Sequence, residues 1–144
     1  MFLGTFTPRL DEKGRLVLPA KWRDELANGL VITRGQERSL RIDAVAEFTR
    51  ITESLREDTP RVAKERREFK RMFFGEAHDE VPDRQGRVTI PTKLREYAGL
   101  GRDCTLIGIL SYIEVWDTAT WEQYQASREQ AYSELSEDQP APDS

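Results

Sequence analysis

Two aspartate–arginine pairs are the residues of this sequence whose types and spacing suggest chemistry. Asp11 stands four residues before Arg15 and Asp83 four residues before Arg87, with a glycine directly before each arginine. A guanidinium group binds phosphate, or binds guanine O6 and N7 as a two-pronged donor. The aspartate does not attract phosphate, so it would cap turn amides or hold the arginine in one orientation. The alternative is an ion pair that only shapes a turn, which contributes little at a surface.

Residue types that support catalysis or metal binding are scarce. His78 is the only histidine and Cys104 the only cysteine, so the chain lacks the residues for a histidine- or cysteine-rich metal site. No glycine-rich phosphate loop with its lysine occurs, and no serine stands in a nucleophile elbow. By residue type Asp11 and Asp83 could serve as a general acid and base, but each lies beside an arginine that keeps it ionised. We therefore expect no enzyme activity, no cofactor and no metal.

The two pairs belong to an internal repeat. The stretch from Asp11 to Arg23 recurs from Asp83 to Arg95, and aspartate, glycine, arginine, proline, lysine and arginine occupy the same places in both copies. Such a match indicates two similar half-domains. Both copies also have further cations nearby. The repetition therefore favours a function for the Asp–Arg pairs over ion pairs that only shape the turns.

Each half reads as a hairpin, a short helix, a second hairpin and a longer helix. In the first half, strand patterns cover 2–7, 15–18, 30–33 and 39–42, and helix patterns cover 20–27 and 45–55, with Asp43 as an N-cap. In the second half, strand patterns cover 88–90, 104–109 and 113–116, and helix patterns cover 93–98 and the residues after the capping Asp117. On that last helix we expect four inward positions, namely Trp121, Tyr124, Ala131 or Tyr132, and Leu135.

A half of this size buries too little apolar surface to fold alone. We therefore expect the halves to intertwine into one pseudo-symmetric, β-rich core flanked by helices. The expected organisation is a first repeat at 1–59, a basic connector helix at 60–75, a second repeat at 76–135 and an acidic disordered tail at 136–144.

The net charge of −4 conceals an uneven distribution. From residue 114 onward there are eight acidic residues and one basic residue, so residues 1–113 carry +3. The sequence pI of about 5.2 is therefore poor evidence against nucleic-acid binding, because local clustering decides it. No apolar run reaches membrane-spanning length, no secretory signal is evident, and the lone cysteine suits a reducing cytoplasm.

Further cations flank both pairs. Lys13 and Arg84 lie in the turns and rank first, ahead of four residues that follow the proline of each copy, namely Lys21, Arg23, Lys93 and Arg95. Residues on a helix behind the turn reach phosphates more easily than base edges. The 61–74 segment has six cations against two carboxylates. Pairing of this segment with acidic surface on a neighbouring subunit is favoured over DNA contact.

The doubled Asp-x-x-Gly-Arg-x-x-x-Pro pattern resembles the MraZ family of bacterial transcription regulators, built on the swapped-hairpin fold of the AbrB and SpoVT regulators. The resemblance extends through residues 1–4, 75–77, 94–100 and 113–116 and covers nearly all of the chain except its tail. It implies a mixed α+β, β-rich fold: two AbrB-like swapped-hairpin repeats forming a double-psi-like barrel flanked by helices. It also implies a DNA-binding repressor of the division and cell-wall gene cluster. Such a repressor would act at direct repeats upstream of its own operon as a ring-shaped homo-oligomer.

Two hypotheses of function result. The first is a sequence-specific regulator that binds double-stranded DNA in the cytoplasm, on the nucleoid. Its contacts would come from Asp11, Lys13 and Arg15 in the first copy and from Asp83, Arg84 and Arg87 in the second. The second is an oligomeric interaction module whose Asp–Arg turns contact other subunits. The expected partners are double-stranded DNA and further copies of the chain, without a membrane.

Overall fold

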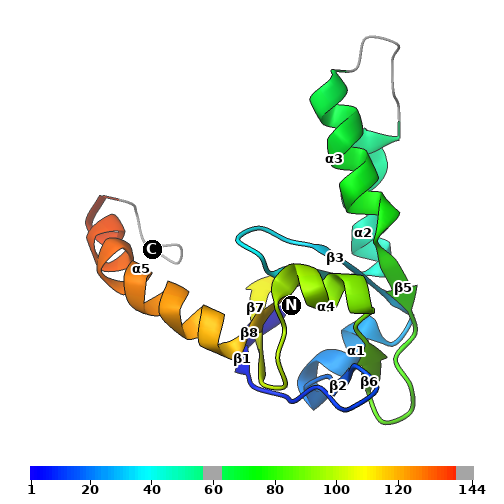
Figure 1. Ribbon diagram of the computed structural model, residues 1–144, viewed down its shortest axis with the longest axis horizontal. Coiled ribbons are helices and arrows are strands. Elements are labelled where there is room, and N and C mark those ends of the chain that lie inside the picture. Colours follow the sequence, from blue (N-terminus) through cyan, green and yellow to red (C-terminus); the bar gives the residue numbers. More distant parts are fainter. Residues whose placement is uncertain (57–62, 139–144) are drawn as a thin grey trace.

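The computed structural model of the chain describes residues 1–56 and 63–138. A six-stranded sheet has the order β1-β7-β8-β4-β3-β5, and a separate ribbon pairs β2 with β6 (Figure 1). All of these strand pairs are antiparallel. The strands are β1 (Phe2–Phe6), β2 (Arg15–Val17), β3 (Leu30–Arg34), β4 (Leu40–Ala44), β5 (His78–Glu80), β6 (Arg87–Thr89), β7 (Cys104–Leu110) and β8 (Ile113–Asp117).

Short helices follow the ribbon strands, and longer helices follow the second hairpin of each half. α1 (Arg23–Leu26) continues a 3-10 turn at Ala20–Trp22, and α4 (Thr92–Ala98) is its counterpart. α2 (Val45–Thr52) and α3 (Lys64–Gly75) project together from one side of the body, whereas α5 (Thr118–Asp138) projects from another (Figure 1). None of the helices in the described ranges is long and apolar enough to cross a membrane.

The two repeats exchange strands. β1 of the first repeat pairs with β7 of the second, and β5 of the second pairs with β3 of the first. β4 and β8 join the two hairpins in the middle of the sheet. Each repeat thus completes the sheet of the other, which covers edges that a separate half would expose. The intertwined, mixed α+β swapped-hairpin fold that the sequence predicts is confirmed.

The hydrophobic core lies between the sheet and the ribbon. Trp22 is fully buried and meets the rings of Phe2 and Phe6 edge-on, at centroid distances of 5.8 and 4.8 Å. The ribbon strands and the residues just after them contribute Leu16, Leu18, Val88 and Ile90, each at most 1% exposed. The same residues that carry the repeat therefore also anchor it to the core.

Asp43 does not cap α2, so that prediction is wrong. β4 continues to Ala44, which pairs with Leu30, and this places Asp43 inside the strand with a fully buried side chain. Its carboxylate accepts hydrogen bonds from Nε and Nη2 of Arg41, at 2.8 and 3.0 Å. A buried carboxylate needs such a partner, and the strand supplies it two residues away.

α5 agrees with the sequence prediction only along its first turns. Asp117 accepts a hydrogen bond from the amide of Thr120 at 3.3 Å, as an N-cap does. Trp121 and Tyr124 pack on Trp116, at centroid distances of 5.2 and 5.0 Å. Further along, the helix has left the body, so Tyr132 is 74% exposed and Leu135 52% exposed instead of facing inward.

The predicted boundaries fall partly outside the described residues. The junction at 59/60 and the first residues of the connector lie among residues 57–62, and α3 begins at Lys64. α5 continues to Asp138, three residues into the predicted tail, and residues 139–144 lie outside the described part. The division into repeats, connector and tail stays a prediction.

The contact between β1 and β7 gives a test of the exchanged sheet. Gly108 faces Gly4, and a Cβ at Gly108 would lie 2.5 Å from the Leu3 nitrogen and the Phe2 carbonyl carbon. These are backbone atoms, so no side-chain rotation relieves the clash. Gly108→Ala should therefore displace β1 and lower the free energy of unfolding by about 1–3 kcal/mol. Urea unfolding followed by circular dichroism measures this loss. Gly75→Ala is the control, since an added Cβ there meets nothing within 4 Å; equal midpoints for the two variants would contradict the prediction.

Candidate nucleic-acid interface

The β2–β6 ribbon places both arginines on one face. Leu16 pairs with Val88 at the centre, with Arg15 opposite Thr89 and Val17 opposite Arg87. Because side chains alternate along a strand, the central pair enters the core and the other four residues form the outer face. The arginines are diagonal neighbours, so their Cα atoms lie about 7–8 Å apart.

Two hydrogen bonds extend the ribbon into the turns. The amide of Leu18 donates to the carbonyl of Gly86, and the amide of Ile90 donates to the carbonyl of Gly14, both at 2.8 Å. Each turn is therefore fixed to the strand of the other repeat. Gly14 and Gly86 have φ of +77° and +75°, a conformation that favours glycine. The turns and the ribbon form one pseudo-twofold unit.

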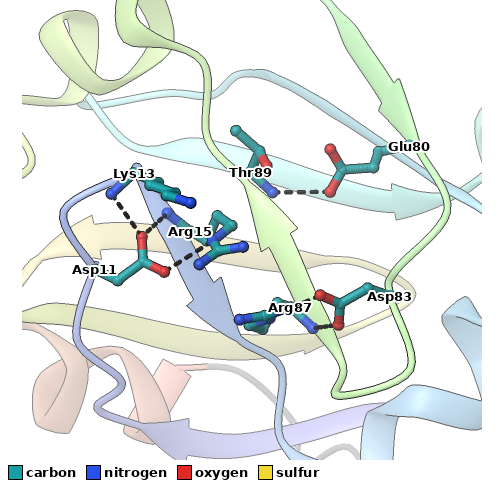
Figure 2. Close-up of polar contacts among 7 residues, drawn as sticks. All are labelled: Asp11, Lys13, Arg15, Glu80, Asp83, Arg87 and Thr89. Carbon is teal, nitrogen blue, oxygen red and sulfur yellow. Dashed lines mark hydrogen bonds and ion pairs between the residues drawn. The ribbon is translucent and has the colours of Figure 1, made fainter.

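One carboxylate organises the first turn. Asp11 accepts the amides of Lys13 and Arg15 on Oδ1, both at 2.9 Å, and Nε of Arg15 on Oδ2 at 2.8 Å (Figure 2). In the ladder, the Arg15 amide points away from β6, so it needs a partner outside the ribbon. The aspartate thus both caps the turn and holds the arginine.

The second turn repeats this arrangement. Asp83 accepts the amide of Arg87 on Oδ1 at 2.8 Å and Nε of Arg87 on Oδ2 at 2.7 Å (Figure 2). The amide of Gln85 also donates to Oδ1 of Asp83, at 2.9 Å. In both turns the arginine side chain donates to its aspartate through Nε, the guanidinium nitrogen nearest the aliphatic part of the side chain. This bond therefore sets the orientation of the fork, whose terminal nitrogens lie further out.

Hydrogen bonding keeps both carboxyls ionised. The amide of Arg15 is the main cause that lowers the pKa of Asp11, and the amide of Arg87 is the main cause that lowers the pKa of Asp83. Such groups are permanent acceptors near neutral pH, which agrees with a positioning role and not with acid–base catalysis. The described part of the chain holds no cluster of three or more metal-ligating side chains.

Arg15 and Arg87 lie at the ends of the ribbon strands and do not protrude from the turns. Each is the first residue of a ribbon strand, and their side chains are 28% and 31% exposed. The reason is the aspartate, which draws each guanidinium back over its own turn.

The other predicted site residues separate into three groups. Lys13 and Arg84 are exposed in the turns. Lys21 lies with Nζ 5.7 Å from the ring centroid of Phe6 on β1, and Lys93 lines a hollow beside the start of β5. The structure therefore places these two lysines toward edge strands of the sheet. Arg23 and Arg95, in contrast, lie against the turn glycines.

Sequence reasoning missed three residues of the ribbon surface. Val17 and Thr89 belong to the outer face, and strand alternation from the two arginines is the signal that would have identified them. Glu80 on β5 accepts the amide of Thr89 at 2.8 Å (Figure 2). The pairing of β5 with the other repeat positions this glutamate, so no local pattern could reveal it.

The two turns are similar but not identical. Glu12 and Lys13 in the first turn correspond to Arg84 and Gln85 in the second, and Val17 corresponds to Thr89. Together the two turn segments, 11–15 and 83–87, carry four cationic side chains against three carboxylates. A single ribbon therefore has a weak net charge.

Comparisons with known proteins agree with the internal repeat and identify a family. A family model described as "MraZ protein, putative antitoxin-like" matches residues 1–72 and again residues 73–140. The "Transcriptional regulator MraZ" proteins of Thermobifida fusca and Frankia alni are each 58% identical to the chain over 138 residues, 96% of both chains. That of Micrococcus luteus is 54% identical over the same share.

The lowered carboxyl pKa values predict how the turns respond to acid. A carboxyl with a lowered pKa stabilises the fold fully above its ordinary value, here 3.8, and this contribution is lost as the pH falls through the lower folded value. The Arg15 and Arg87 amide resonances should thus titrate with midpoints below 3.8 in an NMR pH series. Asp11→Asn should abolish the transition at Arg15 and retain it at Arg87. A midpoint at or above 3.8 in the parent chain would refute this.

Proposed function

The chain belongs to the MraZ family, and we propose that it is a transcriptional regulator that recognises specific sequences in double-stranded DNA. The observation that carries the proposal is the ribbon, whose outer face holds two arginines, each oriented by an aspartate. A two-stranded ribbon fits the major groove, where base pairs are distinguishable. The relatives are named as regulators of transcription, which agrees with the expectation that the chain is not an enzyme.

The geometry suits base reading by Arg15 and Arg87. The diagonal separation of their Cα atoms, about 7–8 Å, is close to two base-pair steps of about 3.4 Å each. A guanidinium already fixed by a carboxylate loses less side-chain entropy on binding than a free one. Thr89 and Val17 beside them offer a hydroxyl and an apolar contact, the latter suited to a thymine methyl.

The three lysines and Arg84 would position the protein on the phosphate backbone of the DNA. Lys13 and Arg84 are exposed next to the reading arginines, and Lys21 and Lys93 lie further out toward the edge strands. Contacts of this kind bind phosphates and carry no sequence information.

The genes regulated and the assembly are proposed on the resemblance. We propose a repressor of the division and cell-wall gene cluster, acting at direct repeats upstream of its own operon as a closed ring of identical subunits. Two observations support the assembly. The weak charge of one ribbon favours several ribbons acting together, and the projecting helices expose Phe69 and Met72 on α3 and Tyr132 and Leu135 on α5.

The turn arginines test the proposal. Arg15→Ala and Arg87→Ala should each weaken binding to the upstream DNA by about 1–3 kcal/mol, the worth of a bidentate base contact, and bind scrambled DNA nearly as before. Fluorescence anisotropy with both DNAs gives the ratio of upstream to scrambled DNA affinity, and circular dichroism checks that the variants are folded. Arg50→Ala on α2, which removes an exposed ion pair with Glu47, is the control.

Sedimentation velocity distinguishes DNA reading from the alternative hypothesis, in which the Asp–Arg turns contact other subunits. If the Asp–Arg turns serve subunit contacts, the arginine variants change the oligomer and leave the preference for upstream DNA intact. That outcome would replace DNA reading with subunit assembly as the role of the turns.

The lysines should behave differently from the arginines. Lys21→Ala or Lys93→Ala should weaken binding to upstream and scrambled DNA alike, because a phosphate contact is lost. The plot of log affinity against log salt should flatten by about one ion for each lost contact. A lysine variant that loses its preference for upstream DNA at an unchanged salt slope would reverse this division of roles.

A further inference from the structure

We infer that Arg23 and Arg95 are positioning residues, each bracing the DNA-reading turn of the other repeat. The inference rests on the proposed function, because it assigns these arginines to the arginine–aspartate turns and not to the phosphate backbone. It adds to that function the residues that support each turn on the side of the short helices.

Arg95 of the second repeat lies against Gly14 of the first. A Cβ built on Gly14 would lie 2.9 Å from Cζ of Arg95 and 3.1 Å from both Nε and Nη1. Three nearly equal distances mean that the flat guanidinium faces the glycine. Nη2 donates to Oγ1 of Thr92 at 2.8 Å, which holds the group in place. Nε is buried without a hydrogen-bond partner among residues 1–56 and 63–138, as expected for a nitrogen enclosed by the turn.

Arg23 of the first repeat lies against Gly86 of the second in the same way. A Cβ on Gly86 would meet Nε of Arg23 first, with Cζ at 2.8 Å and Cδ at 2.9 Å. Nε donates to the carbonyl of Leu18 at 3.0 Å, and the amide of Leu18 donates to Gly86. A continuous chain of contacts thus runs from α1 through the end of β2 to the second turn.

The crossed pattern occurs twice, which argues against an accident of side-chain placement. Each turn is held by an aspartate of its own repeat and by an arginine of the other. Gly14 and Gly86 are therefore required for two reasons, a positive φ and the space that a guanidinium fills. A planar guanidinium can lie flat on a peptide, whereas the compact ammonium of lysine cannot.

This chemistry separates bracing from phosphate binding. Lysine retains the positive charge and binds phosphate, so Arg95→Lys should be nearly silent if Arg95 only contacts the DNA backbone. If Arg95 braces the turn, the same variant loosens Arg15 and lowers the ratio of upstream to scrambled DNA affinity. We expect a fall of roughly five- to tenfold, in the lower range for a lost bidentate base contact, at an unchanged salt slope.

Double variants test the crossed assignment in the full-length chain. In an Arg15→Ala background, the arginine that Arg95 is proposed to hold is already absent, so Arg95→Lys should lower the ratio of upstream to scrambled DNA affinity little further. In an Arg87→Ala background, Arg95→Lys should lower this ratio by the same factor as in the parent chain. Arg23→Lys should show the reverse pattern. The inference would be overturned if each lysine variant lowered the affinity ratio equally in both backgrounds. It would also be overturned if the single lysine variants left the ratio unchanged. Arg50→Lys on α2 is the control for the substitution itself.

NMR without DNA tests the brace independently of the proposed function. Arg95→Lys should shift the amides of Lys13 and Arg15 and leave that of Arg87 in place, and Arg23→Lys should do the opposite. Shifts confined to α4 or α1 would refute the brace. If the parent chain shows no preference for its upstream DNA, the proposed function fails, and the NMR result still decides whether the arginines hold the turns.

Discussion

The antiparallel pairing of β2 with β6 is the interaction on which the rest of the structure depends. It joins the two repeats at their most similar residues, and it turns Leu16 and Val88 inward while Arg15 and Arg87 face outward. A shift of one residue would reverse every side chain of the ribbon. The register is secured by the fully buried neighbours Leu18 and Ile90, whose amides bind the turn carbonyls.

The exchange of edge strands follows from the same constraint. Once the ribbon has joined the repeats, β1 lies beside β7 and β5 lies beside β3, so neither half keeps a complete sheet of its own. The two turns are therefore attached to a single core and not to two lobes joined by a linker. Their relative position is set by backbone hydrogen bonds, which is the precision that a recognition site requires.

Local features of the fold and the intertwining of the two repeats were predictable from the sequence, whereas individual contacts between distant residues were not. The turn at Asp11 and Gly14 was predictable because its hydrogen bonds close within five residues. The contact of Arg95 with Gly14 joins residues from different repeats, and no local pattern encodes it. Asp43 was misassigned because helix capping and strand pairing compete for the same residue, and the pairing of Ala44 with Leu30 prevailed. Tyr132 was placed inward because helical spacing identifies a face but not whether anything covers it.

The differences between the two turns give the molecule a direction. A dimer of identical chains presents the same surface twice and suits a palindrome. Here the duplicate is covalently fused, so Val17 and Thr89, or Lys13 and Gln85, were free to diverge while the backbone stayed symmetric. The ribbon consequently has a distinguishable front and back. Polarity of this kind lets a reader tell one orientation of a DNA site from its reverse, which a strictly twofold reader cannot do.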